Sequence, residues 1–260
     1  MIELRADVGS FKMKCISLFT SFCLGILSLN ADEMTIVSYN IKHGQNMQKE
    51  LRLEDTAKLL KSLKADVIAL QEVDHETTRS AKVDQTEFLG KSLGMHYVFG
   101  KAMDLQGGGY GQAILSKYPI LESKVHRLPG DGEPRIALEV VVEPVKGKNV
   151  SFVSVHLDYR SEEKRQPQIK FLLEALQTVK HPVVLLGDFN AKPESDSMPL
   201  FKAEWFNVPK VGNALTMPSD LPTEEIDHFL LRGWDSKGLT CEVIEEKMVS
   251  DHRPIRMKLK

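Results

Sequence analysis

The sequence contains little cysteine, which limits the chemistry that its thiols can perform. Of the 3 cysteines in 260 residues, Cys15 and Cys23 lie in an apolar segment near the amino terminus, which leaves Cys241 alone in the rest. A single cysteine cannot supply a cysteine-based zinc site, and it carries no sign of thiol catalysis. A lone cysteine in an apolar setting is most often a small core residue, so we expect Cys241 to be buried.

The sequence also lacks a surplus of charge of either sign. It has 34 lysines and arginines against 36 acidic residues, a formal net charge of −2, and no basic tail or stripe. Proteins that bind nucleic acid through many phosphates usually carry such a basic surface. Only 2 tryptophans are available for stacking on bases. These absences disfavour a nuclease with high affinity for DNA or RNA, but they do not exclude nucleic acid as a substrate.

No hydrophobic run is long enough for a membrane span, which needs roughly 20 residues. The apolar segment 15–29 follows two lysines and is followed by Ala31. A basic start, an apolar core and a small residue are typical of a secretory signal peptide. We therefore predict a signal peptide over residues 1–31, with cleavage near Ala31 and with Met13 as an alternative start; an amino-terminal core helix is the other interpretation. The protein is then secreted or periplasmic, and residues 32–260 form one globular domain.

The stretch from Val183 to Asn190 carries the clearest chemical signal. Four apolar residues, 183–186, predict a short buried strand that breaks at Gly187 and is followed by Asp188 and Asn190. In an extended chain, residues two apart point to the same side, so this carboxylate and this carboxamide share a face. The same residue types also favour a simple turn after a strand, and the stretch alone does not decide between the two.

The same pattern, an apolar run that ends in a polar functional group, occurs at other places in the chain. These runs end or begin at Asn40, Glu72, His156, Asp227 and Asp251–His252. Buried polar and charged groups cost several kcal/mol, on the order of 2–7, unless they are paired or bound to a metal. The repetition therefore predicts that these strand ends converge on one polar site.

Helical periodicity appears in three segments between the strand-like runs. Apolar residues recur at helical spacing over 50–64 and 161–178, and a shorter helix is expected to end at Gly94. Strands that occur in runs, with helices inserted among them, predict two packed sheets with helices outside. The segment 194–221 is rich in Pro, Met, Ser and Asn, and we expect it to be a long irregular loop near the site.

Several motifs together resemble those of the endonuclease/exonuclease/phosphatase superfamily of deoxyribonuclease I-like phosphoesterases. They occur in the family's order and approximate spacing between residues 34 and 260: SYNIKHG with Asn40, LQEV with Glu72, GGGYGQAILSKYP with Tyr110, VSVHLD with His156, GDFN with Asp188 and Asn190, IDH with Asp227, and SDHRP with Asp251 and His252. The resemblance implies an α/β (α+β) fold, a four-layer α/β/β/α sandwich of two mixed sheets flanked by helices, and makes 32–260 the catalytic domain.

The resemblance also implies roles for the residues in these motifs. Glu72, with Asn40 and Asp251, is expected to hold Mg²⁺ or Mn²⁺, because an all-oxygen set of ligands suits hard cations better than zinc. Asp251 has an alternative role, which is to raise the pKa of a histidine. The remaining expected catalytic or phosphate-binding residues are Asp188 as the water-activating carboxylate, Asn190, His156 and Arg135 at the phosphate, His252, Asp227 and Tyr110.

These observations predict a secreted, monomeric, divalent-metal-dependent phosphoesterase of a small or lipid-derived phosphodiester or phosphomonoester. The alternatives are an extracellular endonuclease or exonuclease acting on DNA or RNA, and a binding module that keeps the fold without turnover. His43, Asp158 and His228 lie next to motif residues. Each of these three is either part of the site or a structural residue, and the sequence leaves both readings open.

Overall fold

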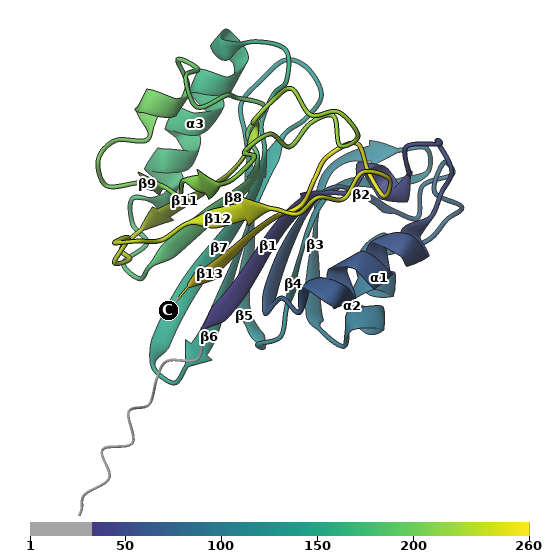
Figure 1. Ribbon diagram of the computed structural model, residues 1–260, viewed down its shortest axis with the longest axis horizontal. Coiled ribbons are helices and arrows are strands. Elements are labelled where there is room, and N and C mark those ends of the chain that lie inside the picture. The colour runs from purple at the N-terminus through teal and green to yellow at the C-terminus, as the bar shows by residue number, and fades with distance from the viewer. Residues whose placement is uncertain (1–32, 260) are drawn as a thin grey trace, which may run out of the picture. The chain divides into compact units, whose positions relative to one another are not determined.

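The computed structural model describes residues 33–259, and the predicted signal peptide lies outside them. The described residues form two packed β-sheets with helices on their outer faces (Figure 1). One sheet has seven strands, in the order β10 (Lys210–Val211), β12 (Cys241–Val243), β13 (Ile255–Leu259), β1 (Met34–Asn40), β2 (Val67–His75), β4 (Gly108–Ser116) and β3 (His96–Leu105). The other has six, in the order β5 (Ile120–Arg127), β6 (Ile136–Val145), β7 (Lys148–His156), β8 (Val183–Asp188), β11 (Asp227–Arg232) and β9 (Phe206–Asn207).

Each sheet contains parallel and antiparallel pairs, as predicted. β1 pairs in parallel with β2, and β7 pairs in parallel with β8, while β13 and β11 run antiparallel to β1 and β8. A parallel connection needs a crossover, which α1 (Leu53–Leu63) supplies between β1 and β2 and α3 (Glu162–Leu176) supplies between β7 and β8. Both parallel pairs bring the carboxyl ends of two strands to the same edge of a sheet.

Three apolar clusters correspond to the three interfaces of a four-layer sandwich. The central cluster joins both sheets, through residues such as Ile36 and Phe152, which are fully buried. A second lies between α3 and the six-stranded sheet, and a third lies between α1, α2 (Gln85–Leu93) and the seven-stranded sheet. In Figure 1, α3 covers one outer face, and α1 and α2 cover the other. The predicted α/β/β/α sandwich is confirmed, and Cys241 is buried in its central layer.

The segment 194–221 is more regular than expected. It contains two short strands, β9 and β10, which pair with β11 and β12, and a 3₁₀-helix, η2 (Met198–Leu200). Strands of two residues are too short to produce an alternating pattern, so periodicity could not predict them. A second 3₁₀-helix, η1 (Lys42–Gly44), follows β1. Within residues 33–259, none of the helices has the length and apolarity needed to span a bilayer.

Gly187 holds the end of β8 close to its neighbouring strand. Its φ is +145°, and a Cβ at this position would lie 2.0 Å from the carbonyl oxygen of Val155 on β7. Only glycine adopts this conformation without strain, and only glycine fits so close to another backbone. The residue that breaks the apolar run therefore sets the position of the adjacent Asp188.

Candidate active site

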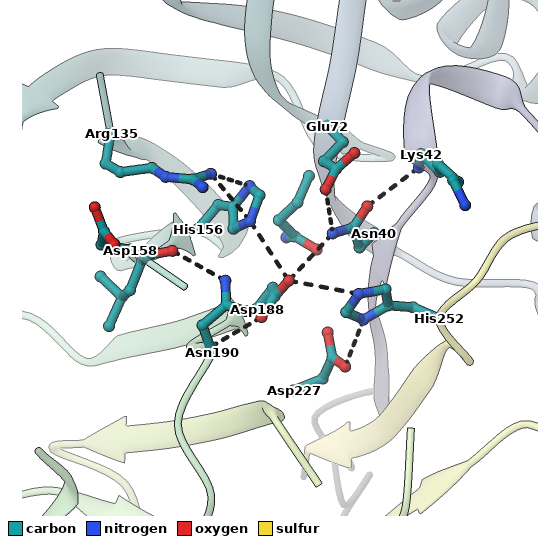
Figure 2. Close-up of polar contacts among 12 residues, drawn as sticks. Asn40, Lys42, Glu72, Arg135, His156, Asp158, Asp188, Asn190, Asp227 and His252 are labelled. Carbon is teal, nitrogen blue, oxygen red and sulfur yellow. Dashed lines mark hydrogen bonds and ion pairs between the residues drawn. The ribbon is translucent and has the colours of Figure 1, made fainter. Parts of the chain in front are cut away.

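The polar strand ends meet at one end of the sandwich, where they join the two sheets. In the six-stranded sheet, Asp188 lies directly between His156 and Asp227 in the strand register. Asn40 ends β1 in the other sheet, and its Nδ2 donates a hydrogen bond to Asp188 Oδ2 over 3.1 Å. Figure 2 shows these side chains pointing toward one another from different strands. The predicted convergence on one site is therefore present in the fold.

Asp188 lies at the centre of this cluster and is buried. Its Oδ2 is 3.5 Å from His156 Nε2 and 3.6 Å from His252 Nε2, in addition to its bond with Asn40. Its Oδ1 accepts a hydrogen bond from the backbone N–H of Asn190 over 2.9 Å. Burial raises the pKa of Asp188 to about 7, although the positive charge of His252 acts to lower it. The sequence left open whether Asp188 and Asn190 form a simple turn or share a functional site. In the structure they do both.

His252 forms a buried ion pair with Asp227. Its Nδ1 lies 3.0 Å from Asp227 Oδ2. Burial by itself would lower the pKa of this imidazole, but the carboxylates of Asp227 and Asp188 raise it to about 10. His252 is therefore positively charged at neutral pH, and its second nitrogen presents an N–H toward Asp188.

His156, in contrast, is neutral, because burial and two cationic neighbours disfavour its charged form. The Nη1 atom of Arg135 lies 2.8 Å from His156 Nδ1. Burial, together with Arg135 and His252, lowers the pKa of His156 well below its usual value. A neutral imidazole can accept a hydrogen bond from the guanidinium on one nitrogen and donate a hydrogen bond from the other. The site thus contains one neutral and one charged histidine on either side of Asp188.

Glu72 enters the site from a bulge in β2. The register between β2 and β4 shifts between Leu70 and Val73, and the φ of Glu72 is +55°. Such a bulge redirects a side chain, here so that Glu72 Oε1 accepts a hydrogen bond from Asn40 Nδ2 over 3.2 Å. Burial raises the pKa of Glu72, and the charge of Asp251 raises it further.

Asp251 also pairs with a residue that the sequence did not suggest. Lys42 Nζ lies 2.8 Å from Asp251 Oδ2, and the backbone N–H of Lys42 donates to Asn40 Oδ1 over 3.1 Å. Lys42 directly follows the SYNI part of the first motif. Its position after the strand end could therefore have indicated that it belongs to the site. The lysine brings positive charge to the predicted metal-binding residues.

Four non-glycine residues in and beside the site motifs have a left-handed backbone. Lys42, His43, Glu72 and Asn190 all have φ between 44° and 55°. Residues other than glycine adopt this left-handed conformation at a cost of about 1–3 kcal/mol each, and such residues cluster at functional sites. Six further non-glycine residues within 33–259 also have positive φ, in turns and at a helix end, so the left-handed backbone orients Glu72 and Asn190 but does not by itself mark the site.

Two sets of side chains at this site are candidates for holding a metal ion. Ligand atoms of Asp188, Asp227 and His252 lie within 4.8 Å of one another. In this set, however, Asp227 Oδ2 is already bonded to His252 Nδ1, and Asp188 Oδ2 accepts a hydrogen bond from Asn40. The predicted set, Glu72 with Asn40 and Asp251, offers oxygen atoms only. Glu72 and Asp251 repel each other, so a hard cation there fits their charge.

The cluster opens into a cavity of about 550 Å³. Its walls include most of the predicted site residues, namely Glu72, Tyr110, Arg135, His156, Asp188, Asn190, Asp251 and His252. Asn40 and Asp227 lie behind this wall and contact Asp188 and His252. Burial, followed by the charge of Glu72, raises the pKa of Tyr110, so its hydroxyl stays protonated as a donor.

The cavity also contains residues that sequence reasoning missed. They are Arg79, Met103, Leu105, Glu133, Tyr159, Met217 and Glu224. The polar stretch that carries Arg79 follows the LQEV motif directly, and Tyr159 follows the VSVHLD motif. Their positions next to these motifs could have indicated that both residues lie near the site. Met217 lies in the segment 194–221 that was expected near the site, and Glu133 lies two residues before Arg135. Met103, Leu105 and Glu224 carry no local pattern.

Three residues beside the motifs, His43, Asp158 and His228, do not line the cavity. His228 is fully buried, and its Nε2 lies 2.8 Å from the carbonyl oxygen of Ala191. Burial, aided by Lys210, lowers the pKa of His228 to about 3, so it stays neutral. Asp158 is paired with Arg160, and the backbone carbonyl of His43 accepts a hydrogen bond from Gln85 over 2.7 Å.

Comparisons with known proteins agree with the motifs. The model of the endonuclease/exonuclease/phosphatase family matches residues 37–252. YbhP of Escherichia coli K12 is 26% identical over 241 residues, which cover 86% of this chain and 95% of YbhP. The structure of a conserved protein from Enterococcus faecalis V583 has a TM-score of 0.73 at 22% identity, covering 86% of this chain and 98% of that one. A mannosyl-6-phosphatase from Bacteroides thetaiotaomicron VPI-5482 has a TM-score of 0.69 at 18% identity, covering 87% of this chain and 100% of that one.

The two structural likenesses, both below 25% identity, establish the shared fold. The family match extends over most of the described residues and includes the strand-end motifs from Asn40 to His252. The chain therefore belongs to the endonuclease/exonuclease/phosphatase family, and it is a metal-dependent hydrolase of phosphoester bonds.

Proposed function

We propose that this protein is a secreted, Mg²⁺-dependent phosphoesterase that hydrolyses a small or lipid-derived phosphodiester or phosphomonoester. The observation that carries the proposal is the single cavity of about 550 Å³ into which Asp188, His156, His252 and Arg135 converge. Pockets of roughly 300–1,000 Å³ are of the size that binds small molecules. A specific DNA interface buries about 1,000–2,500 Å² of protein surface and is strongly basic.

The charge around the cavity also favours a small ester over nucleic acid. Its wall carries Glu133, Glu224 and Asp251 beside the catalytic cluster, and the chain has a formal net charge of −2. These acids are paired with Arg135, Lys192 and Lys42, so the wall carries no basic surplus for the successive phosphates of a polynucleotide. A single phosphoester can be bound by Arg135. The mannosyl-6-phosphatase with the same fold acts on a small phosphomonoester, which agrees with this choice.

We propose that Arg135, His156 and Asn190 bind the phosphoryl oxygens, with the hydroxyl of Tyr110 as a further donor. Arg135 and His156 are already bonded to each other, so both are oriented before a substrate arrives. Donors that are fixed in advance stabilise the charge that develops in the transition state without reorganising.

We propose that Asp188 accepts the proton of the attacking water. A pKa near the operating pH is the most effective for a general base, and burial brings Asp188 into this range. The His252 imidazolium, held by Asp227, adds positive charge on the opposite side of Asp188 from His156. It can stabilise phosphoryl oxygens or donate a proton to the leaving oxygen.

Glu72, with Asn40 and Asp251, is the proposed set of residues for Mg²⁺ or Mn²⁺. A divalent cation bound there supplies positive charge to the phosphoryl oxygens and lowers the pKa of a bound water. Asn40 has a second role that does not depend on the metal, because its Nδ2 bridges Glu72 and Asp188.

The substrate class is tested by comparing small esters with nucleic acid. Purified protein is assayed on p-nitrophenyl phosphate, bis-(p-nitrophenyl) phosphate and plasmid DNA, each with Mg²⁺ and with excess chelator. We expect turnover of at least one small ester that depends on the cation, and little cleavage of the plasmid. Cleavage of DNA without turnover of either small ester would show instead that the protein is a nuclease, and inactivity on all three would favour a binding module.

We also propose that residues 1–31 direct export, from the basic, apolar and small-residue pattern. Expression of the full chain in a bacterium, followed by fractionation and mass measurement, tests this directly. The expected product is an exported protein that begins near Asp32. A cytoplasmic protein that retains residues 1–31 would contradict the proposal.

A further inference from the structure

Arg79 is held rigidly at the wall of the catalytic cavity. It lies in the loop between β2 and α2, and its Nε and Nη2 both donate to the carboxylate of Asp74 over 2.8 Å. Asp74 is fully buried and also accepts a hydrogen bond from Thr77 Oγ1 over 2.6 Å. The backbone N–H of Arg79 donates to Gln106 Oε1 over 2.9 Å. The guanidinium is therefore fixed from behind by a carboxylate that solvent does not reach.

The opposite side of this guanidinium remains available for a ligand. An arginine has five N–H donors, and Asp74 uses one on Nε and one on Nη2. The two donors of Nη1 and the second donor of Nη2 have no acceptor among residues 33–259. The guanidinium also lies over the ring of Tyr110, 5.3 Å from its centroid, which restricts its orientation further. Its remaining donors thus form a planar fork at the cavity wall.

Arg79 is separate from the cluster that surrounds Asp188. Arg135 contacts His156 in the six-stranded sheet, whereas Arg79 follows β2 of the seven-stranded sheet. Both arginines line the same cavity, together with the apolar side chains of Met103 and Leu105. Arg135 is also paired with Glu133 at 3.2 Å, and both residues line the cavity. Arg79 differs because its acidic partner, Asp74, is not part of the cavity wall.

We infer that Arg79 forms a second anion-binding subsite, which binds a phosphate, sulfate or carboxylate group carried by the substrate in addition to the phosphoester that is cleaved. This inference rests on the proposed function. A planar fork of N–H donors matches the oxygens of such groups in a bidentate geometry. The substrate class is then narrowed to small phosphoesters with a second anionic group.

The test compares a monophosphate with bisphosphates whose carbon chains have two to four carbons. Propyl phosphate is compared with the bisphosphates of ethanediol, propanediol and butanediol, by calorimetric binding in chelator and by phosphate release in Mg²⁺. We expect at least one bisphosphate to bind about tenfold or more tightly than propyl phosphate, the factor expected from an added charged hydrogen bond. In Arg79→Gln this preference should disappear while the affinity for propyl phosphate stays within about threefold.

Two further variants keep this result interpretable. Arg79→Gln leaves Asp74 buried without its partner, so the double variant Asp74→Asn/Arg79→Gln, which removes both charges, is measured alongside it. The matched control is Arg256→Gln. Arg256 Nε also donates to a carboxylate, that of Glu242, with Nη2 2.8 Å from the same oxygen, but Arg256 lies outside the cavity. We expect the double variant to lose the preference and the control to keep it.

The outcomes separate this inference from the proposed function. If the protein hydrolyses monophosphates and bisphosphates and binds both with equal affinity, the second subsite is wrong. The proposed phosphoesterase function is then still supported. An equal loss of affinity for both ligands in Arg79→Gln would show that Arg79 binds the cleaved phosphate itself, which also overturns the second subsite. If no ester is hydrolysed, the proposed function fails, and the binding measurements still decide whether Arg79 selects a second anion.

Discussion

An Asp188→Asn variant is expected to lower kcat by about a thousandfold or more while keeping the native fold. Asparagine has nearly the same shape, and its carbonyl oxygen can still accept the hydrogen bond that the backbone N–H of Asn190 donates. Its NH2 group then faces the donors of Asn40 and His252, so we expect a lower thermal stability of the folded variant. Asparagine cannot accept a proton from water at neutral pH, and removal of a general base typically costs 10²–10⁴-fold, about 3–5 kcal/mol of barrier. The measurement is kcat on the best small ester at saturating Mg²⁺, together with circular dichroism and thermal unfolding.

Glu139→Gln is the matched control for this variant. Glu139 is also buried in the six-stranded sheet, where it accepts a hydrogen bond from Ser151 and lies 2.8 Å from His126 Nε2, but it does not line the cavity. We expect its kcat to equal that of the wild type. If Asp188→Asn kept more than about a tenth of the normal rate, the loss would be under ~1.4 kcal/mol, and Asp188 would not be the base.

A Glu72→Gln variant is expected to weaken Mg²⁺ binding by about a hundredfold or more. Replacement of residues that merely orient metal ligands typically costs 10–100-fold in affinity, and the loss of a ligand's charge should cost at least as much. The amide keeps the size of the side chain and can still contact Asn40. The measurement is calorimetric titration of Mg²⁺ into the protein without substrate, and the concentration of Mg²⁺ for half-maximal turnover provides a second readout.

Asp227→Asn separates the two candidate metal positions. Asp227 belongs to the candidate metal site of Asp188, Asp227 and His252, and not to the candidate site of Glu72, Asn40 and Asp251. We expect this variant to bind Mg²⁺ within about threefold of the wild type, because its role is to hold His252 charged. A result in which Asp227→Asn abolishes Mg²⁺ binding and Glu72→Gln does not would place the ion among Asp188, Asp227 and His252 instead.

Much of the fold could be predicted because its signals are local. The apolar stripe over 161–178 predicted a helix that the structure places at Glu162–Leu176, and the run at 183–186 became β8. β5 is mostly exposed and β9 and β10 have two residues each, so neither a buried pattern nor a periodicity marked them. The number of layers came from the family resemblance, because periodicity does not say which elements pack together.

The sequence by itself determined which side chains stand at the ends of the strands, among them Asn40, His156 and Asp188. A short apolar run followed by a polar group is a property of a few consecutive residues, and the chain needs no distant partner to show it. Only the tertiary structure decided the charge states of His156 and His252, the pairing of Lys42 with Asp251, and the place of Arg79 in the cavity. These properties depend on burial and on contacts between residues far apart in the chain, which exist only after the two sheets have packed.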